Sequence, residues 1–192
     1  MLITLKVGSL ATNCYILSDD STRKCVIIDP GDESKRIIKK LKELGLVVEY
    51  IINTHGHPDH IFGDNDVKEF TSAKILAHKN DATMLELIDI KIDRFLEEDD
   101  VVETGKIKLK VIHTPGHTPG GICLLYDDIL FTGDTLFCGT VGRTDLPGGS
   151  EEQIISSVKN KLMILPGKVK ILPGHEDACT IEGEKLHNPY CR

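Results

Sequence analysis

The sequence has 192 residues, of which 40% are hydrophobic and 28% are charged, and this composition is typical of a globular protein rather than a disordered chain. Asp and Glu total 30 against 23 Lys and Arg, which gives a formal net charge of −7. An acidic chain of this kind is not expected to have nucleic acid or an anionic membrane as its main partner.

The length predicts one domain over residues 1–192. No apolar run approaches the roughly 18 residues that a membrane-spanning helix needs. The first seven residues alternate like a strand and lack the basic start and apolar block of a signal peptide, so we expect a cytoplasmic protein. In that compartment the six cysteines, which include no CxxC pair, are expected to be reduced thiols rather than a disulfide framework.

The N-terminal part of the chain is predicted to begin with three short strands separated by turn residues, at 2–7, 13–17 and 24–28. Asp-Pro-Gly ends the third strand, and a helix with one apolar face follows and stops at Gly45. The next predicted strand, Val47–Ile52, leads into Asn53-Thr54-His55.

The rest of the chain alternates helical and strand patterns. Helices are predicted at 60–70, 80–88 and 151–165, the last with Ser150 as N-cap and Gly167 as its stop. Strands are predicted at 73–77 and 107–111, the latter with one lysine-rich wet face, at the hairpin 121–126 and 129–132, and at 170–172. Strand-rich segments with helices between them predict an α/β fold in which helices cover sheets.

A histidine-rich loop, Thr54-His55-Gly56-His57-Pro58-Asp59-His60, carries the strongest chemical signal. His55 and His57 lie two residues apart, so an extended backbone points both side chains the same way. The glycine and the proline allow a sharp turn that can aim Asp59 and His60 at a second point. Imidazole and carboxylate groups are standard zinc ligands, so the loop is predicted to bind metal rather than to be a solvated surface loop.

Four ligands on one loop do not complete two metal coordination shells. Three further candidates each follow an apolar strand with glycine or proline beside them, namely His117, Asp134 and His175. A carboxylate such as that of Asp134 has two oxygens and can bridge two cations.

The motifs HGHPDH, PGHTPGG, FTGDTLF and LPGH, in this order, resemble those of the metallo-β-lactamase-fold hydrolases, and within them the short glyoxalase II-like branch. The segments NCYIL, IIDPG, FCGTVGRTD and NPY are similar to that branch as well, so the resemblance covers nearly the whole chain. It implies an αββα four-layer sandwich, in which two mixed β-sheets flanked by helices hold a metal site at one edge.

The resemblance also implies the ligand set. One divalent metal would be bound by His55, His57 and His117, and the other by Asp59, His60 and His175. Asp134 and a hydroxide would bridge the two ions, and Asp59 and Asp134 are the carboxylates with implied catalytic roles. We expect Zn²⁺ at both positions, while Fe and Mn are accepted by the same ligand types.

The implied reaction is hydrolysis of a small-molecule thioester by attack of the metal-bridging hydroxide, which exists at neutral pH because bound metals lower the pKa of water. A thiolate leaves without much acid help, so no Ser or Cys nucleophile is needed. Arg143 occupies the position of a basic residue for the thiol carrier, where it is expected to bind a substrate carboxylate; its alternative role is an ion pair with Asp145. We expect no added C-terminal helical domain of the kind that binds glutathione in longer relatives.

Four other functions share parts of the same pattern. A mononuclear iron persulfide dioxygenase uses two His and one Asp and shares a GRTD segment, and a lactonase uses the same hydrolytic centre. A non-catalytic metal-binding protein is disfavoured by the complete ligand set, and β-lactam hydrolysis by the expected bridging Asp. Asp29 is expected either to brace the metal loops by hydrogen bonds, as the resemblance implies, or to form a simple turn.

Overall fold

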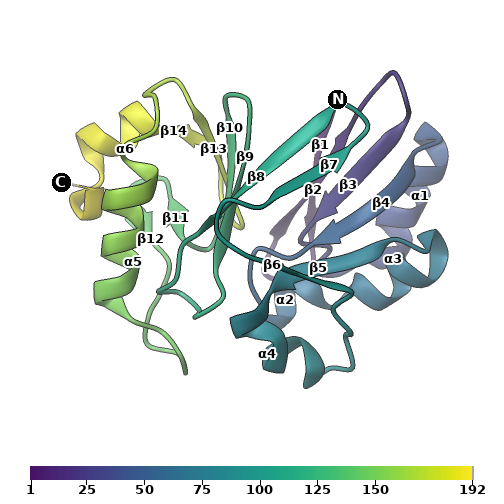
Figure 1. Ribbon diagram of the computed structural model, residues 1–192, viewed down its shortest axis with the longest axis horizontal. Coiled ribbons are helices and arrows are strands. Elements are labelled where there is room, and N and C mark those ends of the chain that lie inside the picture. The colour runs from purple at the N-terminus through teal and green to yellow at the C-terminus, as the bar shows by residue number, and fades with distance from the viewer. Residues whose placement is uncertain (192) are drawn as a thin grey trace.

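Two six-stranded sheets face each other in the computed structural model, which describes residues 1–191 (Figure 1). In the first sheet the strands follow chain order, the first three antiparallel and the last three parallel to their neighbours. Its strands are β1 (Leu2–Val7), β2 (Thr12–Ser18), β3 (Lys24–Ile28), β4 (Val47–Ile52), β5 (Lys74–His78) and β6 (Arg94–Leu96). Helices α1 (Ser34–Leu44) and α3 (Asp64–Thr71) connect the parallel strands and cover the outer face (Figure 1).

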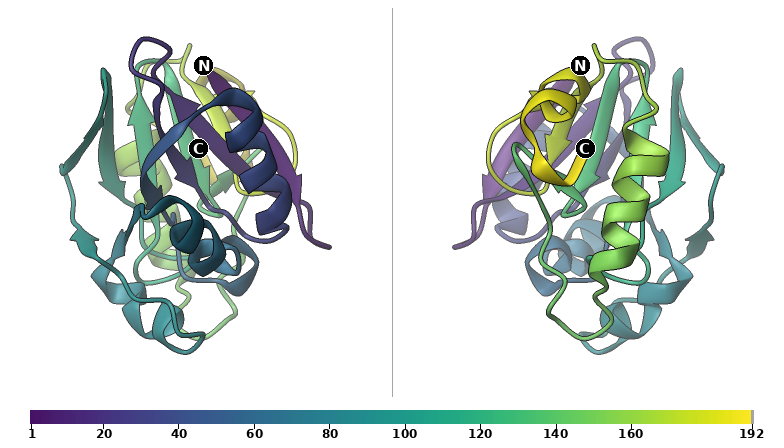
Figure 2. Two further views of the ribbon diagram at one scale, coloured as in Figure 1. Left: turned by 90° about the vertical axis from the view of Figure 1, so that its right-hand side faces the viewer. Right: turned by 90° about the vertical axis from the view of Figure 1, so that its left-hand side faces the viewer.

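The second sheet has the strand order β14-β13-β10-β9-β8-β7, and only its β10–β13 pair is parallel among the described residues. Its strands are β7 (Val101–Thr104), β8 (Ile107–His113), β9 (Ile122–Tyr126), β10 (Ile129–Gly133), β13 (Lys170–Pro173) and β14 (Cys179–Thr180). A small hairpin of β11 (Leu136–Phe137) and β12 (Thr140–Val141) follows β10. Helices α5 (Glu151–Ser157) and α6 (Ile181–His187) cover the outer face, green and yellow in the right-hand view of Figure 2.

Apolar side chains fill three layers because neighbouring residues of a strand point to opposite faces. In β3, Cys25 and Ile27 pack against the helices, whereas Val26 and Ile28 pack between the sheets. A third layer lies between the second sheet and its helices and includes Leu130. Helix, sheet, sheet and helix therefore form a four-layer sandwich, which confirms the predicted fold class.

The predicted helix 60–70 is wrong in one respect, because the structure divides it into α2 (Pro58–Ile61) and α3. The break falls at Gly63, whose backbone N–H donates to Pro30 O at 2.8 Å. A Cβ at Gly63 would collide with that same carbonyl oxygen, so the chain passes too close to the Pro30 loop for any larger residue. The contact anchors the loop that carries the histidines against the end of β3.

Two other predicted helices are shorter than expected. The segment 80–88 forms a 3₁₀ turn (Lys79–Asp81) and α4 (Ala82–Glu86). Helix α5 begins at the predicted cap, where Ser150 Oγ accepts a hydrogen bond from Gln153 N at 3.3 Å. It continues only as a π-helical turn (Val158–Leu162) instead of reaching residue 165.

Helix α6 and five short strands were not predicted from the sequence. The strands are β6, β7, β11, β12 and β14.

In the part of the chain that the structure describes, all six cysteines are free thiols. No helix within residues 1–191 combines the length and the apolar character needed to cross a lipid bilayer.

Candidate metal centre

Loops from both sheets converge where their strands end. The histidine loop follows β4, and three other loops supply His117 after β8, Asp134 after β10 and His175 after β13. The structure therefore brings together all seven side chains that the sequence analysis named as metal ligands.

The first cluster contains His55, His57 and His117, whose donor atoms all lie within 4.8 Å of one another. His57 Nδ1 and His117 Nε2 are 2.8 Å apart. Their rings, and that of His55, meet edge to face, and the three residues are close enough to share one metal ion.

The second cluster contains Asp59, His60 and His175. Asp59 Oδ2 lies 3.5 Å from His60 Nε2 and 3.2 Å from His175 Nε2, and the two histidine nitrogens are 3.3 Å apart. Gly174 makes this packing possible, because a Cβ there would lie 2.6 Å from His60 Cε1.

Asp134 lies between the two clusters. Its Oδ1 is 3.4 Å from His60 Nε2, while its Oδ2 is 3.6 Å from His117 Nε2 and 3.7 Å from His175 Nε2. A single carboxylate thus reaches histidines of both clusters, which is the geometry that a bridging ligand requires.

The hydrogen bonding of the ligand side chains shows that they fit metal ions. Within residues 1–191, the buried atoms His55 Nε2 and Asp134 Oδ1 have no hydrogen-bond partner. A buried polar atom without a partner is costly, and a cation at this place would satisfy both atoms. Imidazole nitrogens and carboxylate oxygens are also the ligand types that divalent zinc, iron and manganese accept, so the residues fit metal ions.

The histidines present lone pairs because their other ring nitrogens are occupied. His60 Nδ1 donates to Asp29 Oδ2 at 2.9 Å, and Thr54 Oγ1 donates to the same oxygen at 2.6 Å. Because the Thr54 hydroxyl donates its only hydrogen to Asp29, its oxygen accepts a hydrogen bond from His55 Nδ1 at 3.1 Å. Asp29 therefore orients both His55 and His60 with Nε2 inward, and the structure shows the bracing role rather than a simple turn.

Backbone carbonyls orient two further histidines, His117 and His175. His117 Nδ1 donates to Arg143 O at 2.7 Å, and His175 Nδ1 donates to Leu10 O at 3.1 Å. Both imidazoles consequently direct Nε2 toward Asp134.

The electrostatics of the clusters differ. Burial, reinforced by neighbouring imidazoles, lowers the pKa of His55 well below its usual value and lowers the pKa of His57 to about 4. Burial acts in the same direction on His60, but the carboxylates of Asp134 and Asp29 outweigh it and raise the pKa of His60 well above its usual value. His55 and His57 are therefore kept neutral at neutral pH, whereas the carboxylates around His60 favour positive charge at this place, as they would favour a bound cation.

Asp81 braces the loops of the first cluster, and nothing in the sequence pointed to it. Its Oδ2 accepts from Gly56 N at 2.9 Å and from Thr118 Oγ1 at 2.7 Å, while its Oδ1 accepts from Gly120 N at 2.6 Å. Gly56 lies between two histidines of the cluster and Thr118 follows the third, so one buried carboxylate connects both loops.

The Arg143 side chain takes part in an exposed ion pair. Its Nε and Nη2 donate to the two carboxylate oxygens of Asp145, each at 2.8 Å. Its role toward a substrate stays a prediction, while its backbone carbonyl orients His117. His78 and His113, for which no metal role was predicted, stack on each other with ring centroids 4.0 Å apart.

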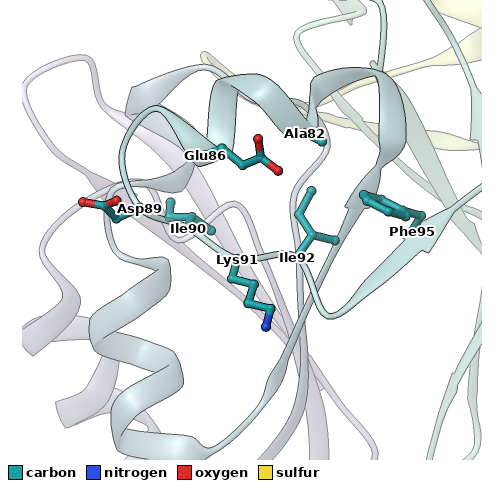
Figure 3. A pocket seen from close by; sticks show the side chains of 7 residues that line it. All are labelled: Ala82, Glu86, Asp89, Ile90, Lys91, Ile92 and Phe95. Carbon is teal, nitrogen blue, oxygen red and sulfur yellow. The ribbon is translucent and has the colours of Figure 1, made fainter.

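Two cavities differ in their relation to the metal centre. One, of about 350 Å³, borders Asp59 and is lined by Leu10, Thr12 and Phe62 among others. The other, of about 390 Å³, lies between α4 and β6 around Ile90, Ile92 and Phe95, and Figure 3 shows its side chains. Only the first cavity includes a residue of the clusters, so it is the candidate substrate cavity of the two.

Comparisons with known proteins find relatives that cover nearly the whole chain. The family model of the metallo-beta-lactamase superfamily matches residues 7–175. The chain is 34% identical over 203 residues to hydroxyacylglutathione hydrolase GloC of Haemophilus influenzae, covering 97% of this chain and 95% of GloC.

Three solved structures are similar over nearly the whole chain. The structure of BLEG-1 B3 metallo-beta-lactamase has a TM-score of 0.92 and 31% identity, with 100% of this chain and 99% of that chain covered. ETHE1 from Myxococcus xanthus has a TM-score of 0.89 and 31% identity, with 98% and 83% covered. TTHA1623 in a di-iron-bound form has a TM-score of 0.84 and 30% identity, with 98% and 99% covered.

Proposed function

The chain belongs to the metallo-beta-lactamase superfamily, as its sequence motifs predicted, and we propose that this metallo-hydrolase uses two metal ions to cleave a small-molecule thioester. The observation that carries the proposal is the position of Asp134, whose oxygens lie 3.4–3.7 Å from histidine nitrogens of both clusters. GloC, named a hydroxyacylglutathione hydrolase, and TTHA1623, solved in a di-iron-bound form, support the reaction and the number of ions.

The proposed ligand set follows the two clusters. One ion would be held by His55, His57 and His117 and the other by Asp59, His60 and His175, and Asp134 would be shared by both. We propose Zn²⁺ in both positions, with Fe or Mn as the ions to which the same ligands are suited. Bound metal supplies Lewis-acid polarisation of the substrate carbonyl and a water of lowered pKa.

The chain itself contributes orientation. Asp29, Thr54 and two backbone carbonyls hold four of the five histidines with their lone pairs inward, and Thr12 Oγ1 donates to Asp59 Oδ2 at 3.2 Å. These hydrogen bonds fix the donors before an ion or a substrate arrives, so little reorganisation is needed when charge develops on the carbonyl oxygen.

The surroundings of the centre suit a thioester in particular. A histidine that binds metal through its lone pair cannot protonate a leaving group, so none of the five histidines proposed as ligands is available as a general acid. A thiolate leaves without such help, whereas an alkoxide or an amine needs a general acid. The Asp59 cavity, bordered by the exposed side chains of Leu10 and Phe62, suits an apolar part of the substrate. Arg143, on the His117 side, suits a carboxylate of the thiol carrier once it leaves Asp145.

We also propose that residues 1–192 form one domain and that the protein is cytoplasmic. The apolar layer between the sheets supports the single domain, because it draws on residues from Tyr15 to Leu172.

The test begins with the metal content per chain, measured by elemental analysis of protein purified from its native host without chelators. Hydrolysis of a hydroxyacylglutathione, other thioesters, a lactone and a β-lactam is then compared. Close to two ions per chain, mostly zinc, with thioesters preferred, supports the proposal. The variant Asp134→Ala should lose activity, while Asp127→Ala, at the turn between β9 and β10, should retain it.

Other results point to other functions. One iron per chain, with oxygen consumption on a persulfide, would replace the hydrolase with a dioxygenase. A preference for the lactone or for the β-lactam, the substrate class that the name of BLEG-1 implies, would keep the metal-dependent hydrolysis and overturn the thioester.

A further inference from the structure

A second group of metal-binding side chains lies outside the metal centre. Cys138 occupies the turn between β11 and β12, Cys179 begins β14, and Glu184 lies on α6. One donor atom from each residue lies within 4.8 Å of the other two. Figure 1 shows β11, β12, β14 and α6 on the same side of the molecule as α5, so three separate segments meet here.

Glu184 is the fixed member of this group. Its side chain is buried, at 4% exposure. Gly139 N donates to its Oε2 at 2.8 Å, and Asn188 Nδ2 donates to the same oxygen at 2.7 Å. In the described chain, residues 1–191, no Lys, Arg or His forms an ion pair with this carboxylate. A buried carboxylate whose charge no cation balances is unfavourable unless something further binds it.

The two thiols face that carboxylate. The sulfur atoms of Cys138 and Cys179 and a carboxylate oxygen of Glu184 lie within 4.8 Å of one another, and Cys138 Sγ donates to Asp177 O at 3.1 Å. Burial, together with the charge of Glu184, raises the pKa of both thiols above the usual value. Thiolates in this position would add negative charge to an unbalanced carboxylate, and only a bound cation would offset the repulsion.

We propose that Cys138, Cys179 and Glu184 form a binding site for a thiophilic divalent cation such as Zn²⁺, separate from the histidine centre. Two sulfur ligands and one oxygen ligand suit zinc, and they leave a fourth tetrahedral position for water. This donor set also differs from the nitrogen and oxygen set of the histidine centre, so the two sites differ in the metals they favour.

The proposed ion would tie together segments that also carry the metal centre. Cys138 follows Asp134 by four residues and precedes Arg143 by five, and Cys179 follows His175 by four. An ion at this site would therefore fix the β11–β12 hairpin and β14 to α6. It would thereby also restrict the movement of the loops that carry Asp134 and His175.

The test is a titration of the metal-free full chain with Co²⁺ alone. Sulfur-to-cobalt charge transfer gives a near-ultraviolet absorption band that ligands with only nitrogen and oxygen donors do not give, so the histidine centre is silent in this readout. We expect the band in the wild type and in the control Cys191→Ser, and its loss in Cys138→Ser and Cys179→Ser. Glu184→Gln should keep the band but require more Co²⁺, because a neutral amide replaces the carboxylate.

A second measurement needs no variant. The unmodified chain is alkylated with iodoacetamide with and without Zn²⁺, and each cysteine is quantified by mass spectrometry. Zn²⁺ should slow the alkylation of Cys138 and Cys179 and leave that of Cys191 unchanged. Equal alkylation rates with and without Zn²⁺, a wild type without the cobalt band, or a Cys138–Cys179 disulfide formed in the presence of Zn²⁺ would each overturn the site.

Discussion

Asp81 should control both the stability of the chain and its affinity for metal, although no metal ligand is altered by its substitution. In Asp81→Ala, the N–H groups of Gly56 and Gly120 and the hydroxyl of Thr118 lose their acceptor. All three bonds lie in the interior, where Asp81 is 1% exposed. The loops of the first histidine cluster therefore lose a shared anchor.

The expected size of the effect follows from these three bonds. Each buried donor without an acceptor lowers the free energy of unfolding by about 1–3 kcal/mol. Part of this loss is offset because the substitution also removes a buried carboxylate. We expect Asp81→Ala to lower the free energy of unfolding by about 3–5 kcal/mol. Asp81→Asn keeps one acceptor oxygen for Gly56 and Thr118, and its amide would face Gly120 N, so a loss of about 1–3 kcal/mol is expected. Affinity for Zn²⁺ should fall by about 10–100-fold in both variants.

Urea unfolding of the metal-free chain and competition for Zn²⁺ with a chromophoric chelator measure the two effects. The matched control is Asp19→Asn, since Asp19 also accepts backbone hydrogen bonds, from Ser21 and Lys106, but contacts no metal loop. This control should be less stable with unchanged Zn²⁺ affinity. Zn²⁺ affinity that is equally unchanged in Asp81→Asn would refute the reasoning, because Asp81 would then support the fold alone.

Three further predictions concern the site and the pH dependence. Asp134→Ala should abolish metal-dependent hydrolysis with an unchanged circular dichroism spectrum, and full activity would exclude a bridging role. Arg143→Ala should raise KM for an anionic substrate more than it lowers kcat, whereas Asp145→Ala, which frees the guanidinium, should lower KM. Unchanged kinetics in both variants would show that the Arg143 side chain only forms its ion pair with Asp145. His78, buried against His113, has its pKa lowered to about 4, below the unfolded value of 6.5. The unfolded chain therefore takes up this proton first, and stability that is complete above pH 6.5 falls as the pH drops toward 4, by about 2 kcal/mol between pH 7 and pH 5. His78→Asn, which cannot be protonated, should lose less stability than the wild type in urea unfolding at those two pH values.

The strongly patterned strands were predictable because each carries several periods of alternation. Strand β8 (Ile107–His113) alternates buried apolar residues with exposed lysines, and the prediction at this place is confirmed. Strands of two or three residues, such as β6 and β14, contain too few positions for a period. They exist because a neighbouring strand pairs with them, as Ile171 does with Cys179. The break at Gly63 likewise depends on Pro30, which is distant in sequence.

The candidate ligands were predictable for a different reason, because histidine and aspartate at strand ends beside glycine and proline form a local pattern. The residues that orient them carry no such pattern. Asp81 lies 25 residues from Gly56 and 39 from Gly120, so only the fold brings it to both loops. The grouping of Cys138, Cys179 and Glu184 depends in the same way on three segments meeting in space.

The two proposed sites should also differ in how strongly they hold metal. In the histidine centre, Asp29, Thr54 and two backbone carbonyls fix the rings through hydrogen bonds that point their free nitrogens inward. Binding there requires little ordering of side chains, although the raised pKa of His60 opposes the loss of its proton. At the second site, two thiols of raised pKa must each release a proton, and Cys138 must also give up its hydrogen bond to Asp177 O, whereas Glu184 is held by two hydrogen bonds to Oε2. Since metal affinity falls with every proton that must be displaced, the histidine centre is expected to fill first as Zn²⁺ is added at neutral pH, and occupancy of the thiol site should rise more steeply with pH.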